Sequence, residues 1–272
     1  MIADAISLLA MDPAAYGGIC LRARVGPARQ AALHAMSEVF PEARKITPAT
    51  DEAALFGALD VVATLAEGRE VRRAGLVRPG AVLILTMAER ASAALCARLG
   101  AALDQGELAA IIALDEGDEE ETVHPALSDR LGLRVDLEGQ RPAAIALARA
   151  SREAVISPEQ INELTTLAAQ LGISGLRPPL FAMRAARGLA ALAGRAEVSD
   201  ADILRAAQLV LAPRATQMPP QETKADTPPP PEETTDAPLQ SKSEQDIPED
   251  ILLDALRANL PPDLLAKLAA RA

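Results

Sequence analysis

The chain has 272 residues, 49% of them hydrophobic, and a formal net charge of −11 at pH 7. This length and apolar content suffice to bury the core of one large or two smaller domains. The aromatic residues are one Tyr and three Phe, so the chain lacks stacking surfaces for single strands as well as excess cations for a phosphate backbone, which argues against nucleic acid as a partner.

The cysteines and the N-terminus indicate where the protein works. Cys20 lies in a strand-like apolar run and Cys96 in a helical pattern, which predicts two small core residues of a reduced, cytoplasmic protein. The N-terminus carries Asp4 and no basic leader, and the longest apolar run, near 80–87, is too short to span a bilayer. We therefore expect neither secretion nor membrane insertion.

Over the first half of the chain, short apolar runs alternate with helical patterns. In chain order we expect a helix at 2–11, a strand at 18–22, a helix at 28–39 begun by Pro27, a strand at 82–85, a helix at 89–103 and a third apolar run at 108–114. Runs of this kind are typical of a parallel sheet that is buried on both faces. The sequence predicts an α/β domain over residues 1–150.

From Ser157 onward the patterns are helical only. Ser157 and Gln160 have the spacing of a capping box, and Gly172 is expected to end the helix that they begin. Two further helices are expected at 177–193 and 199–212. A small helical domain at 151–214 behind an α/β body is the plan of AAA+ ATPases, with the helices as the lid.

The segment after the lid differs in composition. Residues 215–250 hold nine acidic residues and two lysines, a segment charge of −7, together with many prolines. Such a segment buries too little apolar surface to offset its ordering entropy. We expect an acidic, proline-rich linker at 215–248, with an acidic interaction tail as the alternative, and two short amphipathic helices at 249–272.

Residues 18–30 have the frame of a strand that runs into a phosphate-binding loop, without its functional groups. A P-loop needs glycines whose amides surround the phosphates, a lysine for the β- and γ-phosphates and a hydroxyl for Mg²⁺. Ala23 and Ala28 stand at the two glycine positions, Arg29 at the lysine and Gln30 at the hydroxyl. This pattern predicts a degenerate loop.

Several spaced blocks resemble the AAA+ subunits of magnesium chelatase. They lie at 11–13 and 17–19, at 56–60, 65–68, 75–77 and 80–83 before the second strand, at 127–133, and at 175–177 with 184–187. The resemblance covers about residues 1–214. It implies that Arg130 is an arginine finger acting in trans, and that Arg177 joins Gly26 and Arg29 in a weak, degenerate nucleotide site.

This sequence departs from the ATPases of that family at three positions. Thr86 and Met87 stand where Walker B has its Asp and Glu, and Glu116 stands at the sensor-1 position. Carboxylates beside a triphosphate without a bridging metal repel it. We therefore expect no hydrolysis by this chain, and the resemblance is to the non-hydrolysing D-type subunits.

That resemblance implies the partners and the reaction. The chain would assemble with the ATPase I subunit and the porphyrin-binding H subunit, in a complex that uses ATP and Mg²⁺ to insert Mg²⁺ into protoporphyrin IX in chlorophyll or bacteriochlorophyll synthesis. D-type subunits also carry an integrin-like domain. No Asp-x-Ser-x-Ser run is present, so we expect this sequence to stop before that domain.

Other interpretations remain open. A degenerate AAA+ module of the MoxR or clamp-loader kind could be a scaffold for an unrelated client. Arg130 could be a surface residue paired with Asp129, and the acidic run at 119–121 could be a solvated loop or contact a basic partner. His34 and His124 lack the spacing of a zinc site, so we expect no metal bound by this chain.

Overall fold

The computed structural model describes residues 1–118, 121–141, 144–150 and 152–217. Its centre is a sheet of five parallel strands in the order β2-β5-β6-β1-β7. The strands are β1 (Gly18–Arg22), β2 (Arg44–Ile46), β5 (Val82–Leu85), β6 (Ala110–Asp115) and β7 (Leu133–Asp136). The predicted α/β class is confirmed, and the strands expected at 18–22 and 82–85 have the predicted bounds.

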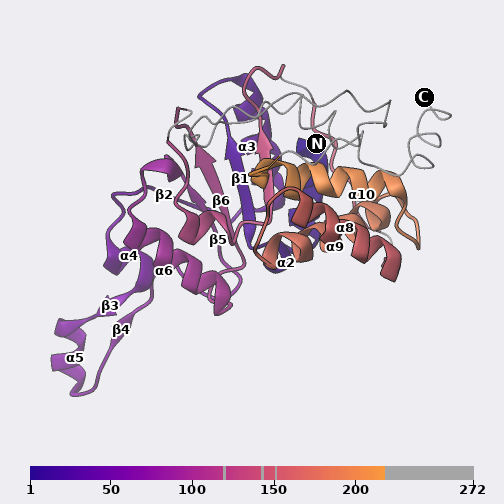
Figure 1. The fold of residues 1–272 in the computed structure, drawn as a ribbon. Helices are drawn as coiled ribbons and strands as arrows, with labels where there is room; N and C mark the ends of the chain where they lie inside the picture. Colours follow the sequence, from indigo (N-terminus) through magenta and orange to yellow (C-terminus); the bar gives the residue numbers. More distant parts are fainter. Residues whose placement is uncertain (119–120, 142–143, 151, 218–272) are drawn as a thin grey trace, which may run out of the picture.

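Helices cover both faces of this sheet (Figure 1). One face packs against α1 (Ile2–Met11) and α3 (Pro27–Val39), and the other against α6 (Ala93–Asp104) and α7 (Pro125–Ser128). Side chains of a strand point alternately to the two faces. Ile19 and Leu21 therefore pack with α1 and α3, whereas Cys20 packs with α6. All six residues of β6 are buried, as the continuous apolar run predicts.

Two of the expected helices are interrupted. The helix predicted at 89–103 is a 3₁₀ turn, η1 (Ala88–Arg90), followed by α6, whose N-cap Ser92 accepts a hydrogen bond from the Leu95 amide at 3.2 Å. The helix predicted at 199–212 is α10 (Asp200–Ala206), which continues as a π-helical turn, η2 (Ala207–Leu211), and a 3₁₀ turn, η3 (Ala212–Arg214). Apolar periodicity alone does not separate these helix types.

The lid also contains α8 (Pro158–Gln170) and α9 (Arg177–Leu192). The predicted capping box is present, because the Gln160 amide donates to Ser157 Oγ at 3.2 Å and the Ser157 amide donates to Gln160 Oε1 at 3.1 Å. Helix α9 packs against α1 at Gly188, where an added Cβ would lie 2.3 Å from Leu8 Cδ2. Because Gly188 has no side chain, helix α9 can approach α1 closely. The lid therefore packs directly against the α/β body.

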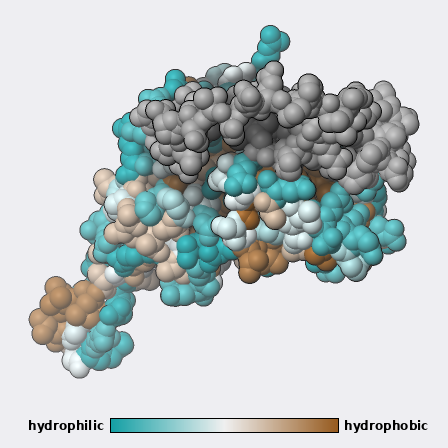
Figure 2. Space-filling view, in the orientation of Figure 1, coloured by the Kyte–Doolittle hydropathy of each residue, from teal (hydrophilic) through white to brown (hydrophobic). Residues whose placement is uncertain are grey.

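An arm projects from the body beyond α4 (Glu52–Phe56) (Figure 1). It consists of the antiparallel strands β3 (Ala58–Leu59) and β4 (Arg72–Arg73), with α5 (Val61–Glu67) between them. Figure 2 shows the apolar surface at its tip, where Val62 and Leu65 are exposed. The sequence patterns did not predict this arm, because two-residue strands carry no measurable periodicity.

Among the residues that the structure describes, every helix is too short or too polar to cross a bilayer. The described part of the chain ends at residue 217. The linker predicted at 215–248 therefore lies almost wholly outside the described residues, and the helices predicted at 249–272 lie outside them entirely.

Candidate functional site

The degenerate loop follows the carboxyl end of β1 and is closed by bonds within the protein. The Ala23 amide donates to the Asp115 carbonyl at 2.9 Å, and the Arg24 amide donates to Glu138 Oε1 at 2.6 Å. Gly26, the N-cap of α3, has extended backbone (φ −175°), and only the Arg24 carbonyl, at 3.8 Å, would contact a Cβ there. Two of the amides that a P-loop offers to phosphates are thus already bonded.

Arg29, at the lysine position, is also bonded within the chain. Its guanidinium lies 2.8 Å from Glu116 Oε1, and both side chains are largely shielded from solvent. The basic group at the lysine position and the acidic group at the sensor-1 position therefore neutralise each other. These residues do not fit a Mg²⁺-triphosphate, because a phosphate would have to displace Glu116 from Arg29 and would then lie beside a free carboxylate.

The Walker B positions give no metal ligand. Thr86 donates its hydroxyl to the Ile46 carbonyl at 3.2 Å, and Met87 adopts a left-handed backbone with φ 51°. Within the described ranges, no group of three or more His, Cys, Asp or Glu side chains could hold a metal ion.

Two buried carboxylates that the sequence analysis did not single out lie nearby. Glu89 accepts a hydrogen bond from the Glu116 amide at 3.0 Å, and Asp115 accepts one from the Gly117 amide at 3.1 Å. Burial raises the pKa of the Asp115 carboxyl, and the charge of Glu89 raises it further. The folded state therefore disfavours the ionised form of Asp115.

We expect Asp115→Asn to make the protein more stable at neutral pH. An acid whose folded pKa lies above its unfolded pKa stabilises the fold at low pH, and this contribution is lost as pH rises through the folded pKa. Asparagine keeps an acceptor for Gly117 without the charge. Urea unfolding at several pH values gives the free energy of unfolding of both proteins. The excess of Asp115→Asn over the wild type should grow from pH 4 upward and then level off. A constant difference would contradict the assignment.

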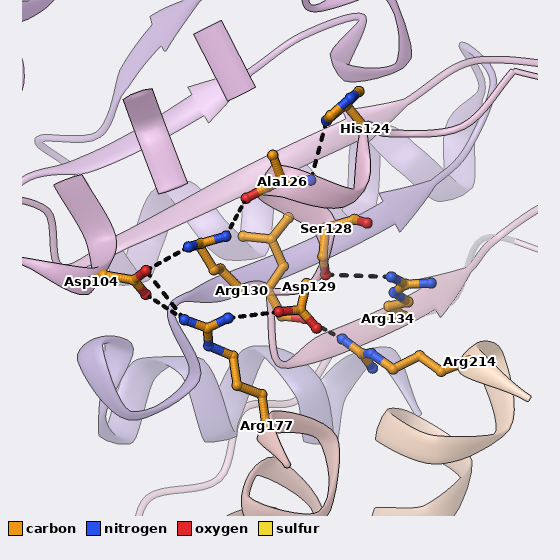
Figure 3. Close-up of polar contacts among 10 residues, drawn as sticks. Asp104, His124, Ala126, Ser128, Asp129, Arg130, Arg134, Arg177 and Arg214 are labelled. Carbon is orange, nitrogen blue, oxygen red and sulfur yellow. Dashed lines mark hydrogen bonds and ion pairs between the residues drawn. The ribbon is translucent and has the colours of Figure 1, made fainter. Parts of the chain in front are cut away.

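Arg130 and Arg177 lie at a different place, where two carboxylates hold them together (Figure 3). Arg130 donates from Nε to Asp104 Oδ2 at 2.8 Å and from Nη1 to the Ala126 carbonyl at 2.7 Å. Arg177 lies 2.7 Å from Asp129 Oδ2 and 3.1 Å from Asp104 Oδ1. We call this group of four residues the arginine cluster: Asp104, Asp129, Arg130 and Arg177. Their side chains are partly open to solvent, with exposures from 24% to 45%.

Secondary-structure ends position all four side chains of the arginine cluster. Asp104 is the last residue of α6, Asp129 and Arg130 follow α7, and Arg177 is the first residue of α9. The hydrogen bond to Asp129 raises the pKa of Arg177, with Asp104 contributing. Asp104 is the residue that the sequence analysis missed. An acid in the last turn of a helix opposes the helix dipole, and this was the one available signal.

The structure thus changes two sequence-based assignments. Arg130 pairs with Asp104 and not with Asp129, whose carboxylate binds Arg177. Arg177 also lies apart from Gly26 and Arg29. The Arg130 carbonyl lies beside Gly17, just before β1, whereas the degenerate loop follows the end of that five-residue strand, roughly 15 Å further along. Within one chain, the structure joins Arg177 to Arg130 and not to the loop.

Comparisons with known proteins agree with this architecture. The family model of the AAA lid domain matches residues 161–234. A solved structure of a protein described as an ATPase, from Cytophaga hutchinsonii, superposes with a TM-score of 0.55, at 15% identity and with 78% of this chain and 83% of that chain covered. At this identity the likeness concerns the fold.

Three sequence relatives are magnesium-chelatase subunits. The 60 kDa subunits of Cereibacter sphaeroides and Rhodobacter capsulatus are 43% and 41% identical, over 98% and 97% of this chain and 50% and 51% of their own. The 67 kDa subunit of Chlorobaculum parvum is 30% identical over 80% of this chain and 43% of its own. The chain spans about half the length of these relatives. By this similarity and its AAA lid, it belongs to the AAA+ family of magnesium-chelatase 60 and 67 kDa subunits.

Proposed function

We propose that this chain is the AAA+ part of a non-hydrolysing magnesium-chelatase subunit. It assembles with the ATPase I subunit and couples ATP hydrolysis there to insertion of Mg²⁺, a substrate of the reaction, into protoporphyrin IX held by the H subunit. This step leads to chlorophyll or bacteriochlorophyll. The identity to proteins named magnesium-chelatase subunits supports the reaction, and the arginine cluster supports the role of this chain in it.

The observation that carries this role is the position of Arg130 and Arg177. Both lie at the amino-terminal edge of β1, partly exposed and away from the degenerate loop of the same chain. A guanidinium stabilises charge on a transferring phosphoryl group only if it reaches that group directly. These arginines therefore serve the nucleotide of a neighbouring subunit. Asp104 acts as a positioning residue that holds both guanidiniums side by side until the neighbour's phosphates replace it.

We expect the isolated chain not to hydrolyse ATP. The Arg29–Glu116 ion pair, the Thr86–Ile46 hydrogen bond and the two bonded loop amides engage groups that stand where a P-loop site binds the metal and the γ-phosphate. Phosphate release by the purified chain should equal the rate without protein. Arg29→Ala is the control for contamination: turnover that disappears in this variant would show a working site and contradict the proposal.

A scaffold of the MoxR or clamp-loader kind is the alternative function. It would use the same fold with an unrelated client and would leave ATP turnover of the chelatase I subunit unchanged. Copurification with that I subunit in the presence of ATP distinguishes the two functions. Capture of the I subunit that depends on ATP would favour the chelatase.

A further inference from the structure

Two further arginines, Arg134 and Arg214, lie where the last turn of the lid meets β7 (Figure 3). Arg134 donates to the carbonyls of Ser128 and Pro213, each at 3.3 Å. Arg214 donates to the Val210 carbonyl at 2.5 Å and also to the carbonyls of Leu131 and Gly132. In the described part of the chain, every hydrogen bond of these two guanidiniums goes to a backbone carbonyl and none goes to a carboxylate.

Neither guanidinium forms an ion pair within 4 Å with a described carboxylate, although the charge of Asp129 acts on Arg214 from further away. The Nε atoms of both arginines are buried and have no hydrogen-bond partner among the described residues. Burial and the nearby charge of Arg134 lower the pKa of Arg214 to about 9. Both side chains are half-buried, and two neighbouring half-buried cations are stabilised when an anion binds between them. The hydrogen bonds that tie the lid to β7 all come from Nη atoms. They give neither Nε atom a partner.

The two guanidiniums line a cavity of about 830 Å³, within the size range of small-molecule sites. Its floor is the sheet face that carries Cys20 and Arg22 on β1, and Cys20 pairs with Arg134 in the strand register. Three acids also line the cavity, and each has a partner. Asp129 binds Arg177, while Asp115 and Asp136 accept from the amides of Gly117 and Glu138. Among the described residues, no carboxylate forms a hydrogen bond or an ion pair within 4 Å with Arg134 or Arg214, and both guanidiniums face a cavity that could admit an anion.

We propose that Arg134 and Arg214 bind an oxyanion, a phosphate or carboxylate group, in this cavity. Two sources could supply it. One is the phosphate of a free ligand, and the other is the acidic segment of this chain, which has five acidic residues between 222 and 236. Residues 212–216 line the cavity, so the acidic segment begins a few residues from it. A tether this short gives an effective concentration of about millimolar.

Titration of the full chain with inorganic phosphate, at constant ionic strength against chloride, tests the site. The same titration is run on a chain in which the five acids at 222–236 are replaced by their amides. In at least one of these two chains we expect Arg134→Gln and Arg214→Gln each to weaken phosphate binding about tenfold. Arg205→Gln, at an exposed lid arginine 4.0 Å from Asp4, should leave it unchanged. If Arg214→Gln fails to fold, Arg134→Gln carries the test.

The two chains also identify the source. Tighter phosphate binding after neutralisation of the five acids, lost again on Arg134→Gln, shows that their carboxylates occupy the site, and equal binding shows that the site is open to a free oxyanion. The proposal is overturned if neither chain binds phosphate in a way that depends on Arg134 or Arg214.

Discussion

Arg130→Ala is expected to lower ATP turnover at the sites that this subunit completes by about 10³-fold or more, and magnesium insertion with it. An arginine finger is typically worth ~10³ to 10⁵ in rate, because its guanidinium neutralises charge that develops on the γ-phosphoryl group. The measurement is phosphate release and metal insertion by the full-length protein reconstituted with the I and H subunits at saturating ATP. Assembly, followed by gel filtration, should remain intact.

Folding should change little, because Arg130 is partly exposed and its ion pair with Asp104 is screened by solvent. Arg205→Ala is the matched control. Arg205 is an exposed lid arginine with a loose 4.0 Å pair to Asp4 and no link to the arginine cluster. A reconstituted Arg130→Ala complex that assembles and works at the wild-type rate would return Arg130 to a structural role beside Asp104.

Arg177→Ala tests whether the arginine cluster works as a unit. Because Arg130 and Arg177 share Asp104, their substitutions should be strongly non-additive: the double variant should lose little more than Arg130→Ala alone. If Arg177 instead bound a nucleotide at its own chain's loop, the two losses would multiply.

The elements that sequence patterns predicted are those with strong periodicity or continuous burial. Helix α1 and strand β1 have the expected bounds because an amphipathic decamer and a five-residue apolar run have few alternative structures. Strand β2 was missed because Arg44 and Lys45 are exposed at the sheet edge, so its three residues read as a polar loop. Strand β7 was missed because Arg134 and Asp136 interrupt its apolar residues.

In the candidate site, too, sequence patterns predicted only what is encoded locally. Motif spacing singled out Arg130 and Arg177 individually, since each lies in a local block. Their juxtaposition depends on Asp104, which is 26 residues before Arg130 and 73 before Arg177. No local pattern links residues at such separations. The Arg29–Glu116 pair has the same origin, because parallel strands bring their carboxyl ends together whatever the intervening sequence.

Gly17→Ala should destabilise the protein and also disturb Arg130. Gly17 ends α2 (Pro13–Tyr16) in the left-handed region with φ 62°, and an added Cβ would lie 2.4 Å from the Arg130 carbonyl oxygen. The left-handed backbone alone costs an alanine roughly 1 to 2 kcal/mol. The contact must also push the Arg130 backbone away, adding about 1 to 3 kcal/mol, as overpacking typically does.

Gly68→Ala separates these two contributions. Gly68 ends α5 with φ 65°, close to that of Gly17, and no atom lies within 4 Å of its Cβ position. Urea unfolding should therefore show a clearly larger loss of stability for Gly17→Ala. In the reconstituted complex at a temperature where both variants are folded, only Gly17→Ala should lower ATP turnover, since only that Cβ displaces Arg130. Equal stability and equal turnover of the two variants would mean that the approach of Arg130 to β1 does not position the finger.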